Sequence, residues 1–257
     1  GPIVAPVLGG YLDVTFGWQS SFLISGLLGI LVLLFAWFRL SETRPQEVMA
    51  ASGSFGDALR RYLTLLRSRS FIGYTLIFGF CQGTFFAFLP VAPQIFESRY
   101  QVGAEAFGLY WGLLSLSYMA GAFSSGKLVR IFDLDRTLAF GCIGIFTTIM
   151  FLLGVSLAAP LQFSVLVCSV TVAMFFSGIA CPLALTGSVS DNPSMTGAAS
   201  GLSSSLGMGV GALFSLLTGY VYDGTSQPMI LLMSLTVTGC LLSLFLSRSK
   251  GRDAAQI

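Results

Sequence analysis

Long apolar runs separated by short polar segments make up most of this sequence. A transmembrane helix needs about 20 mostly apolar residues. A window of that length finds a partial run at 1–12 and seven full runs after it. The full runs are 20–38, 71–92, 107–126, 138–157, 162–185, 197–221 and 229–246. The pattern predicts an all-α integral membrane protein.

One long polar segment, 39–70, interrupts the apolar runs. Its apolar residues recur at helical spacing with arginines on the opposite side: Phe55, Leu59, Tyr62, Leu63 and Leu66. This pattern is typical of an amphipathic helix that lies on a membrane surface. A solvated linker is the alternative interpretation.

The amino-acid composition also indicates a protein that is surrounded by lipid rather than by water. The mean hydropathy is +0.84 and 9% of the residues are charged, whereas a soluble domain carries roughly 25% charged residues. The chain has no histidine, which excludes a histidine metal site, proton relay or catalytic base. The five cysteines lie inside apolar runs without paired spacing, so they are expected to be buried small apolar residues. The chain opens inside an apolar stretch without methionine, so we expect it to continue a longer protein.

The charged residues sort by loop. Twelve of the 13 basic residues lie in alternate loops, in segments 39–70, 127–136 and 248–252, and the opposite loops hold Arg99 alone. Because Lys and Arg accumulate on the cytoplasmic side, segment 39–70 and the C-terminus are expected in the cytoplasm. No charge falls at membrane depth, where it would cost at least about 3 kcal/mol and mark an ion pathway. Any carboxylate that binds a proton or sodium ion within the membrane is therefore expected outside these residues.

The run 71–92 has an aromatic face with one amide in its middle. The members of this face follow at steps of about four: Tyr74, Phe78, Gln82 and Phe85 or Phe86. An amide in hydrocarbon is costly unless it faces protein or water. Such a face suits an apolar or cationic drug through stacking and cation–π contact. The alternative is that Gln82 bridges two helices while the aromatic rings face lipid.

Glycines follow helical spacing in 197–220. Gly197 and Gly201 are four residues apart, as are Gly207 and Gly211, and Ser205 and Gly209 form a second small stripe. Small residues four apart indicate close helix packing. Such faces also let one helix slide along another.

The segment 126–138 is short and basic and includes Gly126, Arg130 and Arg136. A tight basic turn can pair with acids and helix C-termini and so latch one conformation. The simpler interpretation is that any short internal loop is basic.

The first ten residues combine proline with glycine, which bends a helix and lets a neighbour approach closely. This run resembles the antiporter motif in the fifth helix of major facilitator superfamily drug exporters. The matched positions are Gly1, Pro6, Gly9 and Gly10, with Ala5 where the motif has a glycine. The Ala-Pro, the following Gly-Gly-Tyr-Leu and a later Phe-Gly-Trp are similar to the bicyclomycin and chloramphenicol resistance branch (Bcr/CflA). Gln19 stands where those relatives usually have arginine.

The resemblance implies a fold. Segment 126–138 resembles the second copy of the superfamily's cytoplasmic loop signature. The chain would then hold helices five, in part, to twelve: residues 1–38 end the N-terminal half, 39–70 are a cytoplasmic linker, 71–247 form the six-helix C-terminal half and 248–257 are a tail. The run 71–92 would be the seventh helix, which lines the central cavity. Further cavity candidates, chosen by depth and family geometry, are Ser115, Tyr118, Met174, Phe175, Ser204 and Met208.

The resemblance also implies a function. It is proton-coupled export of drugs or small molecules across the bacterial inner membrane by alternating access. The expected partners are a small-molecule substrate, protons and the lipid bilayer, with no cofactor, metal or nucleic acid, and the protein is expected to be a monomer. A metabolite uptake symporter of the same superfamily and a non-transporting membrane bundle are the alternatives. An enzyme has no support, because there is no histidine, no intramembrane acid and no Ser or Cys beside a base.

Overall fold

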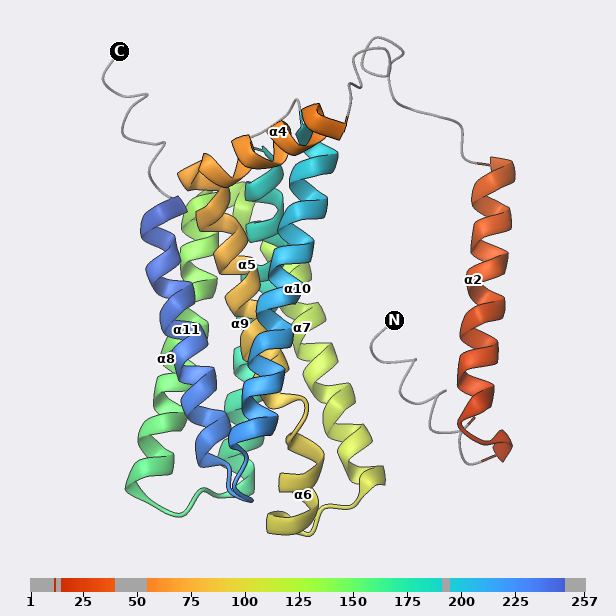
Figure 1. Cartoon of the computed structure of the whole chain (residues 1–257). Helices are drawn as coiled ribbons and strands as arrows, with labels where there is room; N and C mark the ends of the chain where they lie inside the picture. Colours follow the sequence, from red (N-terminus) through yellow and green to blue (C-terminus); the bar gives the residue numbers. More distant parts are fainter. Residues whose placement is uncertain (1–11, 13–14, 40–54, 191–194, 248–257) are drawn as a thin grey trace. The chain divides into compact units, whose positions relative to one another are not determined.

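The computed structural model describes residues 12, 15–39, 55–190 and 195–247, and all their regular elements are helices (Figure 1). Contacts divide the chain into two units, Gly1–Ala58 and Leu59–Ile257. Within the described ranges seven helices are long and apolar enough to cross a membrane. This confirms the seven full runs. The partial run 1–12 lies outside the described residues except for Leu12.

The first unit contains helix α2 (Gln19–Arg39), which has no buried residue. A helix that is hydrophobic all round suits a membrane span. Gly17 has a φ of 82° just before it, a left-handed conformation that glycine adopts without strain. The Ser20 hydroxyl donates to the Gly17 carbonyl at 2.7 Å and so fixes the first turn.

The second unit begins within α4 and is built around two inner helices. Its helices are α4 (Phe55–Arg67), α5 (Arg69–Phe88), α6 (Ala92–Tyr100), α7 (Ala104–Phe132), α8 (Leu134–Ala158), α9 (Phe163–Ser190), α10 (Thr196–Val221) and α11 (Gln227–Ser247). Helix α5 packs against α9, α10 and α11, and α9 also packs against α7 and α8. The apolar stretches that include α5 and α9 are 56% buried each, against 11% in α7 and 28% in α10. Helices α7 and α10 therefore expose most of their apolar surface.

Helix α4 confirms the helix predicted within 39–70, and it runs across the end of the second unit (Figure 1). Four of the residues expected on its apolar face are exposed: Leu59, Tyr62, Leu63 and Leu66. Leu65, which the sequence pattern did not select, is fully buried and packs with Phe71 and Ala199. One apolar residue thus anchors α4 to α5 and α10, and the other four remain available to a membrane surface.

The segment between the runs 71–92 and 107–126, which holds Arg99, was expected to be a loop, but it contains helix α6. Pro93 lies in its first turn, a position where proline costs no hydrogen bond. Phe96 is buried and makes edge-on ring contacts at centroid distances of 5.1–6.3 Å. The Tyr100 hydroxyl donates to the Leu161 carbonyl at 2.9 Å. At nine residues this helix is too short for the window that finds membrane spans.

The segment 126–138 is also different from the loop that was expected. Helix α7 continues to Phe132 and α8 starts at Leu134, so Asp133 alone separates them. Asp133 has φ 67° and ψ 166°, a conformation rare outside glycine. The Thr137 hydroxyl donates to the Asp133 carbonyl at 2.7 Å and holds this turn.

The connection between α10 and α11 is held by polar contacts. Asp223 accepts hydrogen bonds from the hydroxyl and the backbone N–H of Thr225 at 2.7 and 2.9 Å. These bonds favour the carboxylate and lower the pKa of Asp223. Gln227 at the start of α11 donates from Nε2 to the Ser156 carbonyl at 2.6 Å. That bond ties the end of α8 to the start of α11.

The glycine stripe of α10 packs in part. Gly207 and Gly211 face α5, where a Cβ would lie 2.2 Å from the ring of Phe78 and 2.7 Å from that of Phe86, respectively. Gly197, Gly201 and Gly209 face open space and Ser205 is exposed. The packing prediction is confirmed for Gly207 and Gly211. For the other four positions it stays a prediction, because no described residue packs against them. Ser203, one turn before Gly207, completes the stripe through a 2.9 Å hydrogen bond with Thr75.

Four of the five cysteines are buried as expected, and all five are free thiols. The sulfurs of Cys81 and Cys240 lie 3.8 Å apart, and those of Cys240 and Cys142 lie 3.5 Å apart. These three thiols fill the space where α5, α8 and α11 meet. Cys168 on α9 is exposed, so the prediction that every cysteine is buried was wrong.

Helices α7 and α9 approach each other closely at two glycines. A Cβ on Gly121 would lie 1.9 Å from the Phe175 carbonyl oxygen, and one on Gly178 would lie 2.1 Å from the Tyr118 carbonyl oxygen. The Ser117 hydroxyl adds a 2.7 Å hydrogen bond to the Thr171 carbonyl. Only a residue without a side chain permits this contact.

Gly121→Ala should therefore separate α7 from α9. We expect it to lower the free energy of unfolding by about 1–3 kcal/mol, as overpacking does. Gly112→Ala in the same helix is the matched control, because nothing lies within 4 Å of its added Cβ. Thermal unfolding of the purified protein in detergent measures both variants. Equal midpoints for the two would contradict this account of the contact.

Candidate functional site

The amide of Gln82 lies at the meeting point of three helices. Gln82 is half-buried in α5. Its Nε2 donates to the Met208 sulfur of α10 at 3.7 Å, and its Oε1 accepts from the Cys181 thiol of α9 at 3.6 Å. The structure thus brings together two residues predicted for a cavity, Gln82 and Met208, and adds Cys181.

Both partners of this amide are weak. A thiol is a weak donor and a thioether a weak acceptor, whereas a primary amide has two donors and two lone pairs. Met208 is exposed, so the amide is not sealed from its surroundings. Gln82 therefore keeps hydrogen-bonding capacity that an oxygen or nitrogen of a ligand could use better than sulfur does.

Tyr118 of α7 adds a hydroxyl to the cluster of Gln82, Met208 and Cys181. It is half-buried, and its hydroxyl lies within hydrogen-bonding reach of the Cys181 thiol. Ser177, one turn before Cys181 on α9, is buried, and its hydroxyl has no hydrogen-bond partner among the described residues. A buried hydroxyl of this kind calls for an explanation. Helices α5, α7, α9 and α10 each contribute a polar or sulfur-bearing side chain near Gln82.

An aromatic group continues from Gln82 along α5. The ring of Phe85 lies 5.5 Å from that of Trp111 on α7 and 5.6 Å from that of Phe86. Phe86 packs over Gly211 of α10. Trp111 was not among the predicted site residues. Its spacing of four and seven residues from Ser115 and Tyr118, both cavity candidates, is the sequence signal that could have found it.

Phe78 and Tyr74, the other members of the predicted aromatic face, lie in helix contacts. Phe78 fills the space beside Gly207 of α10. The Tyr74 ring fills the space beside Gly187 of α9, and its hydroxyl donates to the Asp135 carboxylate of α8 at 2.5 Å. Tyr74 thus meets Asp135 rather than the group around Gln82.

The remaining cavity candidates lie on three helices. Ser115 on α7 and Ser204 on α10 are half-buried. Met174 on α9 is buried in the core. The Phe175 ring contacts Phe176 at 5.6 Å, and its carbonyl oxygen lies against Gly121. Their place in a cavity stays a prediction.

The predicted latch residues lie on two helix ends. Gly126 and Arg130 belong to the last turns of α7, and Arg136 lies in the first turn of α8; all three are exposed. Asp135, beside Arg136, bonds Tyr74 and so ties the α7–α8 turn to α5. Gly1, Ala5, Pro6, Gly9 and Gly10 of the antiporter motif lie outside the described residues.

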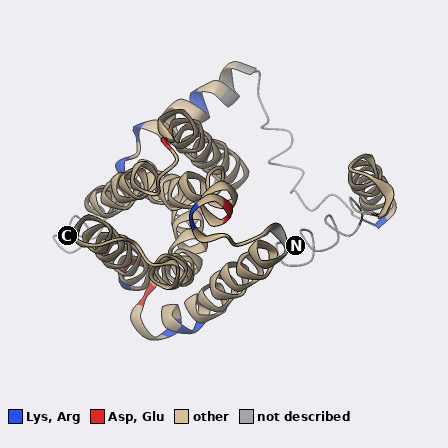
Figure 2. Cartoon of the chain, turned by 90° about the horizontal axis from the view of Figure 1, so that it is seen from below, with Lys and Arg blue, Asp and Glu red and all other residues tan. Residues whose placement is uncertain are grey.

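The described charged residues lie at helix ends, in α4 and α6 and in the short connections (Figure 2). The described side chains around Gln82, the amide in the middle of α5, are therefore neutral. Among the described residues no group of three or more His, Cys, Asp or Glu side chains could hold a metal ion. The arrangement suits non-covalent binding of a neutral or cationic organic molecule.

Comparison with protein families agrees with this architecture. A family model described as Major Facilitator Superfamily matches residues 1–216. The chain is 30% identical, over 238 residues, to an uncharacterized MFS-type transporter, YdgK, of Bacillus subtilis; the match covers 91% of this chain and 58% of the relative.

Two further relatives have names that refer to drugs. A bicyclomycin resistance protein homolog of Haemophilus influenzae is 24% identical over 251 residues, which is 97% of this chain and 62% of the relative. A chloramphenicol resistance protein of Pseudomonas aeruginosa is 28% identical over 140 residues, 54% of this chain and 32% of the relative. The chain spans about three-fifths of the length of the first two relatives.

Tyr74→Phe tests the bond between α5 and the α7–α8 turn. We expect loss of the hydroxyl to lower the free energy of unfolding by about 1 kcal/mol, the net worth of one hydrogen bond. Asp135→Asn in the Tyr74→Phe background should add little, because the bond is already gone. Tyr220→Phe is the matched control, since Tyr220 is 89% exposed. Additive losses for Tyr74→Phe and Asp135→Asn in thermal unfolding would show that the two residues are not coupled.

Proposed function

The chain belongs to the Major Facilitator Superfamily, and from this premise we propose that it works in proton-driven export of drugs or other small molecules. The mechanism is alternating access, in which two helical halves rock about a site near the middle of the membrane. The side of the bundle that carries α4 faces the cytoplasm of a bacterial cell, and the protein acts as a monomer in the inner membrane.

The observation that carries the proposal is the weakly satisfied amide of Gln82 inside a neutral, aromatic surrounding. A substrate that offers one hydrogen-bonding group replaces the sulfur partners Met208 and Cys181. An apolar or cationic ring stacks on Phe85 and Trp111, which are already 5.5 Å apart. The drug-resistance names of two relatives support the same substrate class.

The neutral surrounding of Gln82 favours export of drugs over uptake of a polar metabolite. A sugar phosphate or an organic acid needs several charged or polar partners. Around Gln82 the described partners are a thioether, a thiol and, through Cys181, the hydroxyl of Tyr118. The site therefore selects a molecule with much apolar surface and few polar groups.

Proton coupling in this proposal needs a carboxylate outside the described spans. Asp135 is close to α5, but it lies in the first turn of α8 and accepts the Tyr74 hydroxyl. The group that takes up the proton therefore belongs to residues beyond those that form the Gln82 site, and the second unit supplies the substrate contacts.

Gln82→Ala tests the substrate contact. In cells that lack their own exporters and carry the full-length protein, we expect resistance to at least one drug to change by about fivefold, the effect of one hydrogen bond. Membrane abundance should stay close to that of the wild type. Gln94→Ala, at an exposed position of α6, is the control. Unchanged resistance to every drug in the panel would remove Gln82 from the site.

Collapse of the proton gradient tests the driving force. Efflux of a fluorescent cation from cells that express the full-length protein should stop when a protonophore is added, because no proton gradient then remains to drive the export. A sodium ionophore at constant membrane potential should leave efflux unchanged. Efflux that survives the protonophore but stops when the sodium gradient is removed would contradict proton coupling.

A further inference from the structure

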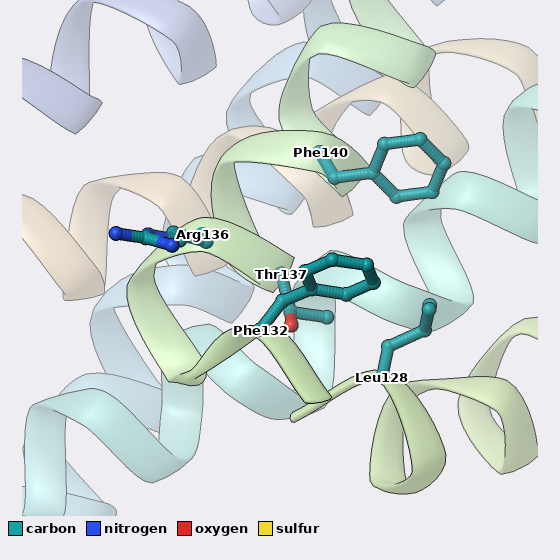
Figure 3. A pocket seen from close by; sticks show the side chains of 5 residues that line it. All are labelled: Leu128, Phe132, Arg136, Thr137 and Phe140. Atoms are coloured by element: carbon teal, nitrogen blue, oxygen red, sulfur yellow. The ribbon is translucent and has the colours of Figure 1, made fainter. Parts of the chain in front are cut away.

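A cavity of about 260 Å³ lies where α7 turns into α8. Its lining residues are Leu128, Phe132, Arg136, Thr137 and Phe140 (Figure 3). They come from the last turns of α7 and the first turns of α8. The cavity is separate from the group around Gln82, and none of its residues contributes to that site.

The lining of this cavity is almost wholly apolar. The rings of Phe132 and Phe140 are 51% and 52% exposed, and Leu128 is half-buried. Thr137 is buried and donates its hydroxyl to the Asp133 carbonyl, so it gives the cavity no free donor. Water would fill such a space poorly, because it needs two to four polar partners.

The size of the cavity limits its occupant. Pockets that enclose drug-sized molecules measure about 300–1,000 Å³. At about 260 Å³ this cavity suits an apolar ligand that is narrower than a drug molecule. Helices α7 and α8 are both membrane-span candidates. The apolar ligand available beside them in a membrane is a lipid acyl chain.

The charge beside the cavity is positive. Arg136 is exposed, and in Figure 3 its guanidinium extends away from the rings of Phe132 and Phe140. Arg130 and Lys127 lie in the last turns of α7 and are exposed. Two acids are nearby: Asp133 in the turn and Asp135, whose carboxylate accepts the Tyr74 hydroxyl of α5.

We propose that this cavity is a binding site for an anionic phospholipid. One acyl chain lies against Leu128, Phe132 and Phe140, and the phosphate of the headgroup pairs with the Arg136 guanidinium. Arginine matches phosphate through two parallel hydrogen bonds, and basic pockets between membrane helices near the cytoplasmic face bind anionic headgroups. Because the cavity spans both sides of the turn at Asp133, bound lipid joins the end of α7 to the start of α8.

Native mass spectrometry of the full-length protein in detergent tests this site. The protein is titrated with phosphatidylglycerol and with phosphatidylcholine of the same acyl chains. We expect phosphatidylglycerol to bind about fivefold more tightly, as one basic residue near the headgroup provides. Arg136→Gln should bring the two affinities within about twofold of each other, and Arg136→Lys should keep the preference because it keeps the charge. Arg60→Gln, at an exposed position on α4, should change nothing.

A second variant tests the cavity rather than the charge. Leu128→Trp fills the space between the rings and should weaken both lipids, with thermal unfolding showing that the protein remains folded. Inorganic phosphate should not displace the lipid, since phosphate alone gains nothing from the apolar lining. Equal affinity of the wild-type protein for the two lipids, or a preference that survives Arg136→Gln, would overturn the proposal. If Leu128→Trp does not fold, the Arg136→Gln and Arg136→Lys pair still decides it. The outcome is independent of drug export, because binding alone is measured.

Discussion

Close contact through small residues is the constraint on which the second unit depends. In lipid, apolar side chains do not select one helix partner over another, so small residues and hydroxyl pairs decide which faces meet. Gly121 and Gly178 bring α7 and α9 into backbone contact. Thr84 and Thr236 join α5 to α11 at 2.8 Å, as Thr75 and Ser203 join α5 to α10. These contacts set the rotation of α5 and α9, the two inner helices.

The rotation of α5 places its one central amide toward α9 and α10. Gln82 then meets Cys181 and Met208, which are partners that satisfy an amide poorly. The same rotation turns Phe85 toward Trp111. A site with unused hydrogen-bonding capacity and aromatic walls therefore follows from helix packing alone, and none of the described residues that form it is charged. That is the physical basis of the proposal that the substrate is a neutral or cationic organic molecule.

The end of the bundle at Asp133 combines three different requirements. The chain must reverse direction within one residue, the turn must stay attached to α5, and the two helix ends beside it line a cavity. Asp133 adopts an unusual backbone conformation, and Asp135 makes the attachment through Tyr74. The two helices leave a cavity beside the turn, and the rings of Phe132 and Phe140 that line it remain exposed. The lipid site proposed above is this cavity.

The amino-acid sequence by itself determined the seven apolar runs that form long helices and the helix in 39–70. Each of these depends on the length and polarity of a run, which the lipid environment constrains strongly. The tertiary structure decided the rest. Helix α6 is too short to give a span signal, and the exposed Cys168 lies in a run as apolar as those of the buried thiols. Gln82 and Met208 were both cavity candidates, but the sequence did not predict that they touch or that Cys181 joins them. A helix that is apolar all round carries almost no periodic signal of its rotation, and its partners are chosen only when small residues on neighbouring helices come into contact.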